Sequence, residues 1–171
     1  MLNGNNNRGF TLVELIITII LSGIAMVMFA GIYASTQVNS VSPIMQVKAA
    51  ELAQAYLEEI SLKRFDEQSP VGNQYRCDEN PAIPCSNTLA SDGETRDRFD
   101  DVDDYNNLNE LPPRDALGNI RNGFNGFSAS VVVSYAGTDQ GFGARDLKRI
   151  EVTITSPEDD LFVFSLYKGN F

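Results

Sequence analysis

The chain contains no histidine and no tryptophan, and it is short of basic residues. Without an imidazole, neither a Ser-His nor a Cys-His catalytic pair can be assembled. Thirteen Lys and Arg stand against 23 Asp and Glu, which gives a net charge of −10. Nucleic-acid interfaces need clustered Lys and Arg, so this balance argues against a nucleic-acid partner. The sequence predicts a protein that is not an enzyme and, at 171 residues, has about the size of one domain.

Charge is also missing from one long stretch near the N-terminus. Between Phe10 and Ala34 the only side chain that is charged at neutral pH is that of Glu14. As a helix, the stretch from Leu15 to Ala34 would span ~30 Å, the thickness of the hydrocarbon core of a bilayer. We therefore expect a membrane-spanning helix over residues 10–34.

The residues before this stretch are polar. The leader, residues 1–9, has no apolar run and ends in Arg8-Gly9. A secretory signal peptide has the opposite arrangement, with its cleavage site after the apolar run. The positive charge that precedes the apolar run predicts a cytoplasmic leader, with the chain beyond about Ser35 on the other side of the membrane.

Glu14 lies inside the apolar stretch. A carboxylate there costs ~2.5–3.5 kcal/mol on membrane-insertion scales, which makes it a candidate functional residue. A positive charge at the same depth would offset this cost, and a new α-amino group on Phe10 of a neighbouring subunit would supply one. The alternative is a simple uncleaved anchor with Glu14 near the lipid headgroups.

The segment GFTLVE, residues 9–14, resembles the G-F-T-L-x-E signature of type IV prepilins and type II secretion pseudopilins. The resemblance implies that a prepilin peptidase cuts between Gly9 and Phe10 and N-methylates Phe10. It implies that Glu14 directs assembly, and that the apolar helix leaves the inner membrane to pack against other pilins in a filament. The C-terminal part would then lie in the periplasm before assembly and on the cell surface afterwards.

A second, amphipathic helix is predicted over residues 35–64. Pro43 should bend or break the chain, and Ser42 before it is a suitable N-cap. Apolar residues then recur at helical spacing on one face, which needs a covering surface. These residues are Met45, Ala49, Leu52, Ala53, Tyr56 and Ile60. We expect this face to pack on a sheet of its own domain, although a groove on a partner is the alternative. A continuous helix over 10–64 would extend ~80 Å, so its first half is expected to project.

Alternating apolar residues predict strands over 127–135, 147–156 and 161–168. Turn-rich segments join them, which is typical of an antiparallel meander with one face to cover. The sequence thus predicts an α+β fold, with a long N-terminal helix packed on an antiparallel sheet in residues 127–171. This is the pilin-like fold that the resemblance implies.

Residues 65–126 show no periodicity and are expected to form a long irregular loop region, of a kind that usually carries function. Because this part of the chain is exported, Cys77 and Cys85 are expected to form a disulfide, with two unpaired thiols as the alternative.

An acidic cluster follows in the same region. Carboxylates concentrated on a loop can bind calcium, although the EF-hand pattern is not met because Tyr105 occupies the next ligand position. The alternative is a solvated turn whose carboxylates cap a short helix and pair with Arg98 or Arg114. Apart from calcium, no cofactor is expected. The candidate ligands are Asp100, Asp101, Asp103 and Asp104.

A second resemblance is spread more widely. Residues 55–60 (AYLEEI), the Cys77 and Cys85 pair, and residues 98–105 (RFDDVDDY) together resemble the D-type minor pilins of mannose-sensitive haemagglutinin (MSHA) pili. The chain lacks a cysteine pair around its C-terminal region, and Gly31 stands where many major pilins have a proline. Both differences favour a minor subunit over the bulk filament subunit. The resemblance implies that such a minor subunit takes part in pilus assembly and adhesion.

Two alternatives remain open from the sequence. One is a minor pseudopilin of a type II secretion system. The other is a binding subunit displayed on the pilus, such as a tip adhesin or a DNA-uptake receptor. For DNA, the only support is a small basic group made of Arg145, Lys148 and Arg149.

Overall fold

The computed structural model describes residues 11–38, 41–69, 76–79 and 81–170. The chain divides into two compact units, Met1–Ile44 and Met45–Phe171. The elements in chain order are α1 (Leu12–Val38), α2 (Val41–Ser61), η1 (Arg96–Arg98), η2 (Asp103–Tyr105), β1 (Leu108–Glu110), β2 (Ser128–Tyr135), η3 (Thr138–Gln140), β3 (Leu147–Thr155) and β4 (Leu161–Gly169).

The first unit is built on α1, in which the hydroxyls of Thr11, Thr18 and Ser22 form hydrogen bonds within the helix. The hydroxyl of Thr11 accepts a hydrogen bond from the backbone N–H of Glu14 at 3.3 Å, which gives the helix an N-cap. Farther along, the hydroxyls of Thr18 and Ser22 donate to backbone carbonyls one turn earlier. The two hydroxyls in the apolar stretch therefore need no partner outside the helix.

The interruption between the two helices comes slightly earlier than predicted. Helix α1 ends at Val38 and α2 begins at Val41, so Ser42 lies inside the first turn of α2. The prediction that Ser42 is the N-cap is therefore wrong. Pro43 is also in this first turn, where its missing N–H has no helical partner to lose.

The sheet in the second unit confirms the predicted antiparallel meander. Its strand order is β1-β2-β3-β4, and each neighbouring pair is antiparallel. The strands predicted over 127–135, 147–156 and 161–168 correspond to β2, β3 and β4. The short strand β1, which pairs Leu108 with Val131, was not predicted.

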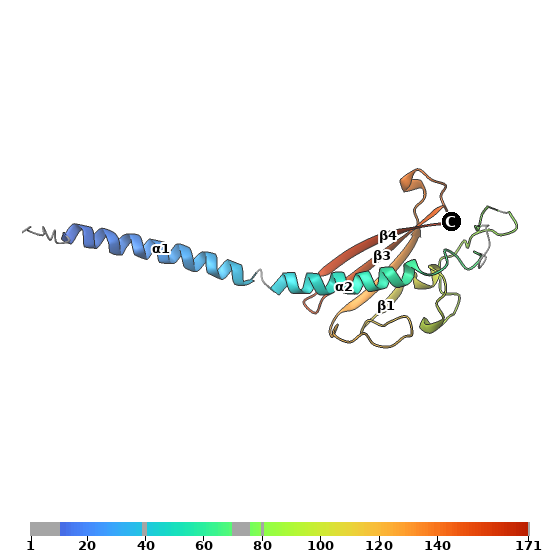
Figure 1. Cartoon of the computed structure of the whole chain (residues 1–171), viewed down its shortest axis with the longest axis horizontal. Coiled ribbons are helices and arrows are strands. Elements are labelled where there is room, and N and C mark those ends of the chain that lie inside the picture. The colour runs from blue at the N-terminus through green and yellow to red at the C-terminus, as the bar shows by residue number, and fades with distance from the viewer. Residues whose placement is uncertain (1–10, 39–40, 70–75, 80, 171) are drawn as a thin grey trace, which may run out of the picture. The chain divides into compact units, whose positions relative to one another are not determined.

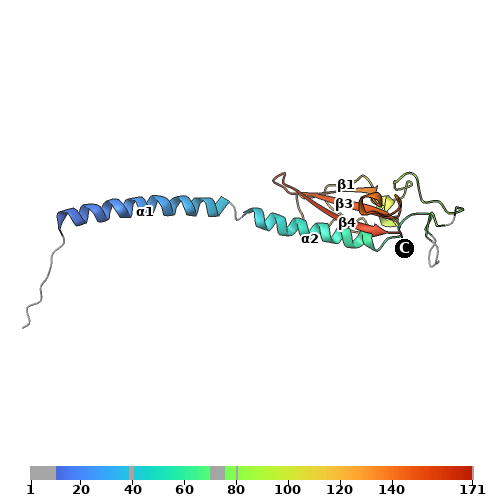
Figure 2. The same ribbon diagram turned by 90° about the horizontal axis from the view of Figure 1, so that it is seen from above.

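Helix α2 covers one face of this sheet, as the two views show (Figures 1 and 2). The predicted apolar stripe is the face that packs, because Ala49, Leu52, Ala53, Tyr56 and Ile60 are all buried. Met45 packs against the same core and is partly buried. Strands β2 and β3 contribute Ala129, Val131, Val133, Ile150, Val152 and Ile154, and Phe127 joins them from just before β2. The predicted α+β fold, with a helix packed on an antiparallel sheet, is confirmed.

The segment predicted as an irregular loop region adds to the core. Phe99, Val102 and Tyr105 are buried in the same cluster as α2 and the sheet. Phe65, Cys77 and Cys85 form a second, smaller cluster. Parts of the segment between α2 and β2 are therefore packed into the core of the domain.

Candidate functional site

Over Leu12–Gly31 the surface of α1 is apolar on every side, apart from Glu14, Thr18 and Ser22. From Thr11 to Gly31 each residue is exposed, and Met26 and Phe29 are exposed by 77% and 74%. By length and composition, Leu12–Gly31 is able to cross a membrane. Exposed apolar surface of this extent needs lipid or other protein around it.

Glu14 lies in the first turn of α1, where the helix dipole favours a negative charge. Its side chain is exposed, and the ion pairs found among the described residues do not include it. Gly9 and Phe10, the predicted cleavage and methylation site, lie outside the described residues. Glu14 is thus an ionisable group on an otherwise apolar surface, with its carboxylate open to a partner.

The carboxylates of the acidic cluster are largely used inside the domain. Asp101 accepts hydrogen bonds from the backbone N–H groups of Asp103 (2.7 Å) and Asp104 (3.1 Å). Asp104 in turn accepts from the N–H groups of Asp100 and Asp101. These contacts hold the turn that leads into η2, because each carboxylate accepts hydrogen bonds from nearby backbone N–H groups.

The cations that pair with this cluster differ from those expected. Asp100 pairs with Arg64 at 2.5 Å, and Asp103 pairs with Lys148 at 2.7 Å. The predicted partners Arg98 and Arg114 do not take these places: the Arg114 side chain instead donates to the carbonyl of Gly118. Arg64 and Lys148 lie far from the cluster in sequence, so their pairing depends on the fold.

Carboxylate oxygens also approach one another at the exposed side of this segment. Two sets of three lie within 4.8 Å, one of Glu67, Asp100 and Asp101, the other of Glu94, Asp100 and Asp104. Exposed acidic groups commonly lie this close without an ion. Calcium at Asp100, Asp101, Asp103 and Asp104 stays a prediction, which thermal unfolding with calcium and with EDTA would test.

Lys148 joins three parts of the domain. Its side chain is fully buried, and its ammonium group lies 2.7 Å from Asp103 and 3.2 Å from Asp66. It also donates to the carbonyl of Phe65 at 2.6 Å and lies 4.3 Å from the centre of the Phe65 ring. Lys148 therefore connects β3 to η2 and to the segment after α2.

The burial of Lys148 bears on the basic group that was considered as a DNA-binding surface. Lys148 is buried rather than exposed, and the guanidinium of Arg145 lies 3.7 Å from Asp78 and donates to the carbonyl of Cys85. Arg145, Lys148 and Arg149 therefore do not form an exposed basic group, and the DNA-binding alternative loses the sequence feature that supported it. A signal was present in the sequence, because period two places Lys148 on the same face of β3 as Ile150 and Ile154.

Burial changes the proton affinity of two carboxyls beside Lys148. Burial raises the pKa of Asp103 to about 7, since Asp101 and Asp66 act in the same direction and Lys148 only partly offsets them. Burial also raises the pKa of Asp101 to about 6, with Asp104 as the main neighbouring charge. Asp66 differs, because hydrogen bonds from Gln68 and Ser86, together with Lys148, outweigh burial and lower its pKa.

A second buried ionic network ties α2 to the segment that follows it. Arg96 pairs with Glu59 of α2 and, at 3.1 Å, with Glu110 of β1. Glu59 also pairs with Arg121 at 2.9 Å and accepts a hydrogen bond from the hydroxyl of Tyr105. These pairs are largely removed from solvent, so they fix the position of the segment rather than offer a binding site.

Cys77 and Cys85 form a disulfide in the structure, with their Cα atoms 4.9 Å apart. Both are buried, and the side-chain amide of Asn170 donates to the carbonyl of Cys77 at 2.9 Å. The disulfide-linked loop is thereby attached to the C-terminal end of the chain.

Comparison with known proteins identifies the N-terminal segment. Residues 4–30 match the family model described as the prokaryotic N-terminal methylation motif. No curated protein and no solved structure matches the chain. The motif supports a type IV pilin-like or pseudopilin protein, which is a structural rather than an enzymatic class. It implies processing by a prepilin peptidase and assembly with other pilins, and together with α1 it suits membrane anchoring before assembly.

Proposed function

We propose that this chain is a minor pilin of a type IV-like pilus of the MSHA type. The prepilin peptidase cuts between Gly9 and Phe10 and methylates Phe10, and α1 then carries the subunit into the pilus. One observation carries this proposal: within the methylation motif, α1 is apolar on all sides and has one carboxylate, Glu14, in its first turn.

The mechanism is physical rather than catalytic. Before assembly, lipid surrounds the exposed apolar side chains of α1; in the filament, the helices of other subunits replace the lipid. Glu14 is costly in an apolar medium unless a cation meets it. The amine of Phe10 on a neighbouring subunit supplies that cation, so the pair selects one longitudinal register between adjacent helices.

The second unit remains in the periplasm while α1 is in the inner membrane, and it reaches the cell surface with the pilus. The Cys77–Cys85 disulfide is compatible with that route, because disulfides persist in oxidising compartments such as the periplasm.

Mass spectrometry of pili sheared from cells tests the proposal. The expected N-terminal peptide begins at Phe10 and carries one N-methyl group. Recovery of the chain only from the membrane fraction, with residues 1–9 still attached, would contradict both the processing and the filament role.

The same features of α1 also support a minor pseudopilin of a type II secretion system. Deletion of the chain separates the two functions. A minor pilin is needed for surface pili and the adhesion they provide, whereas a minor pseudopilin is needed for the release of secreted proteins from the periplasm.

A further inference from the structure

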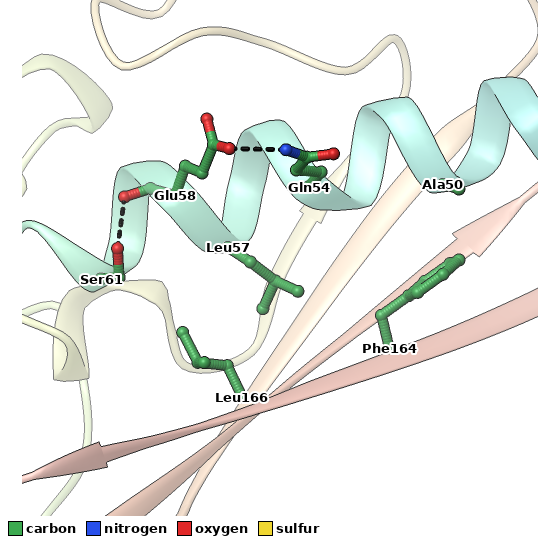
Figure 3. A pocket seen from close by; sticks show the side chains of 7 residues that line it. All are labelled: Ala50, Gln54, Leu57, Glu58, Ser61, Phe164 and Leu166. Carbon is green, nitrogen blue, oxygen red and sulfur yellow. Dashed lines mark hydrogen bonds between the residues drawn. The ribbon is translucent and has the colours of Figure 1, made fainter.

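The chain becomes enclosed where β4 ends. In the middle of the strand, Phe164 and Leu166 line an open groove that Leu57 lines from the side of α2 (Figure 3). Beyond this groove, Lys168 donates hydrogen bonds to backbone carbonyls at the end of α2 and just after it, and burial lowers its pKa. Asn170, the residue after the strand, is only 2% exposed. Asparagine is mostly exposed in proteins, so its burial here calls for a structural reason.

Asn170 is held by hydrogen bonds to other segments of the domain. Its backbone N–H donates to the carbonyl of Asp146 at 2.9 Å, and its backbone carbonyl accepts from the Arg76 side chain at 3.4 Å. The side chain adds a hydrogen bond of 2.9 Å from Nδ2 to the carbonyl of Cys77. The residue before it pairs with the start of β3, which fixes the direction of the backbone. Both the backbone and the side chain of Asn170 therefore have a defined place.

The side chain of Asn170 covers the disulfide between Cys77 and Cys85. Its Nδ2 atom lies 3.5 Å from the Sγ atom of each cysteine, so it contacts both sulfurs. Phe65 and Tyr135 pack against the same cysteines. The two cysteines are 0% and 1% exposed, although most of the described residues between them are exposed. The disulfide is therefore enclosed by parts of the domain that come from outside its own loop.

A negative charge adds to this enclosure. A carboxylate oxygen of Asp66 lies within 4.8 Å of both sulfurs. Although burial opposes it, hydrogen bonds from Gln68 and Ser86 and the charge of Lys148 lower the pKa of Asp66, so its carboxylate is ionised at neutral pH. Disulfides are attacked by thiolate anions, and a buried carboxylate beside the sulfurs repels them.

We propose that Asn170 is a lock on the Cys77–Cys85 disulfide. While Asn170 is docked, an external thiol does not reach either sulfur, so the disulfide exchanges only when the end of β4 opens. Access to a sulfur limits thiol–disulfide exchange as much as the reactivity of the thiol does. The bond therefore forms before Asn170 docks, and folding then preserves it. This inference goes beyond the proposed function and holds equally for a pilin or a pseudopilin.

Reduction of the full chain by dithiothreitol tests the lock. A thiolate of dithiothreitol attacks one sulfur and breaks the Sγ–Sγ bond, and its second thiol then releases the mixed disulfide. The protein gains two cysteine thiols, and dithiothreitol is oxidised to its cyclic disulfide. Because the sequence has 2 cysteines, every thiol that a maleimide labels comes from this bond. Mass spectrometry of the labelled chain therefore gives the rate of reduction.

The unmodified chain supplies the first result, which does not depend on the folding of any variant. In detergent micelles without urea, its disulfide is expected to be reduced at least ~10-fold more slowly than in the same chain unfolded by urea, since reduction has to wait for a local opening. Equal rates for the folded and the unfolded chain would show that the sulfurs are accessible in the folded state, and the proposal would fail.

Asn170→Ala removes the amide that covers the sulfurs and keeps the backbone hydrogen bond to Asp146. Reduction of this folded variant is expected to be several-fold faster than that of the unmodified chain. Asn87→Ala is the matched control, because Asn87 is exposed near Cys85 and accepts a hydrogen bond from Arg145. Its removal leaves Asn170 over the sulfurs, so the rate is expected to stay the same. No acceleration in Asn170→Ala, or equal acceleration in both variants, would overturn the proposal.

Urea separates the opening of the lock from a general loss of stability. A local opening exposes little surface, so its frequency depends weakly on urea, whereas global unfolding exposes much more and depends on urea steeply. The rate of reduction of Asn170→Ala is expected to stay nearly constant from no urea to the onset of unfolding. A rise as steep as that of global unfolding would mean that the substitution only destabilises the domain, and it would refute the lock.

Discussion

Lys148 is a buried cation whose charge is balanced by buried carboxylates. Its ammonium group contacts Asp66 and Asp103, and its removal would leave both carboxylates in the interior without it. Loss of one partner of a buried ion pair typically costs ~3–5 kcal/mol. We therefore expect Lys148→Met to lower the free energy of unfolding by about this amount, measured by urea unfolding.

Lys48→Met provides the control for that substitution. Lys48 is exposed and donates a hydrogen bond to the carbonyl of Gly123 at 3.1 Å. Exposed substitutions of this kind usually change stability by less than ~0.5 kcal/mol. Similar small losses in both variants would show that the buried pairs around Lys148 contribute little.

The same cluster predicts how stability depends on pH. The pKa of Asp103 is raised to about 7 and that of Asp101 to about 6, both above the ordinary value of 3.8. Between those values the folded state binds more protons than the unfolded state, so the contribution of these groups to the free energy of unfolding falls as pH rises. We expect the free energy of unfolding to fall in this way between about pH 4 and pH 7. Thermal unfolding measured in buffers across that range tests this expectation.

Asp103→Asn isolates the largest part of this effect. Asparagine resembles the protonated carboxyl and does not titrate, so the variant lacks the loss of stability that accompanies deprotonation. Relative to the unmodified chain, it is expected to gain stability as pH rises from 5 to 8. A stability difference that stays constant over this range would show that Asp103 titrates normally. Asp66, whose pKa is lowered, acts only at lower pH.

At the scale of elements, α1 exposes Glu14 in its first turn, and the proposed function pairs this carboxylate with the Phe10 amine of a neighbouring subunit. Glu14→Ala removes the charge but keeps the Thr11 hydroxyl that caps the helix. We expect processing between Gly9 and Phe10 to continue, while the amount of the subunit in sheared pili falls because the register-selecting pair is lost. Immunoblots of the membrane and pilus fractions measure both steps.

Thr18→Ala is the matched control on the same helix. The Thr18 hydroxyl donates to the carbonyl of Leu15 at 2.9 Å, so its removal changes no contact outside the helix. This variant is expected to enter pili normally. If Glu14→Ala were recovered in pili at the same level as Thr18→Ala, Glu14 would have no assembly role.

Long periodic elements were predictable from the sequence, whereas short ones were not. The stripe from Ala49 to Ile60 and the alternation in β3 identified the buried faces, because each face repeats over many residues. Strand β1 spans only Leu108–Glu110, and its place is fixed by pairing with β2 and by the contact of Glu110 with Arg96. Such non-local partners leave no local pattern to detect.

The functional residues also divide into those that the sequence identified and those that it did not. Glu14 was identified because a charge in an apolar run stands out in the sequence itself. The partners of the acidic cluster were assigned incorrectly, because Arg64 and Lys148 come near Asp100 and Asp103 only after folding. Arg98 and Arg114 were predicted as ion-pair partners because they lie near the cluster in sequence, but Arg64 and Lys148 form these pairs.

At the scale of the whole molecule, the hydrophobic core lies entirely within the second unit. Every buried residue of the two core clusters lies between Ala49 and Ile154, whereas the chain from Thr11 to Gly31 is exposed. Stability and membrane attachment therefore depend on different parts of the chain. The buried core that stabilises the fold lies in Met45–Phe171, and the segment able to cross a membrane lies in α1.

Deletion of residues 1–44 tests this division. The remaining chain, Met45–Phe171, retains all of the core residues and the disulfide, so it is expected to unfold in urea in one cooperative transition. It should also lose its attachment to membranes, since Leu12–Gly31 is removed. Urea unfolding followed by circular dichroism, and the distribution between soluble and membrane fractions, measure the two outcomes.

A longer deletion, of residues 1–60, supplies the contrast. It removes Leu52, Tyr56 and Ile60, which are fully buried against the sheet, and it leaves Arg96 without Glu59. Loss of a single large apolar side chain from a core costs ~2–5 kcal/mol, so loss of several exceeds the stability of an ordinary domain. The longer deletion is therefore expected to be unfolded. A shorter deletion that also failed to fold would show that α1 contributes to the stability of the second unit.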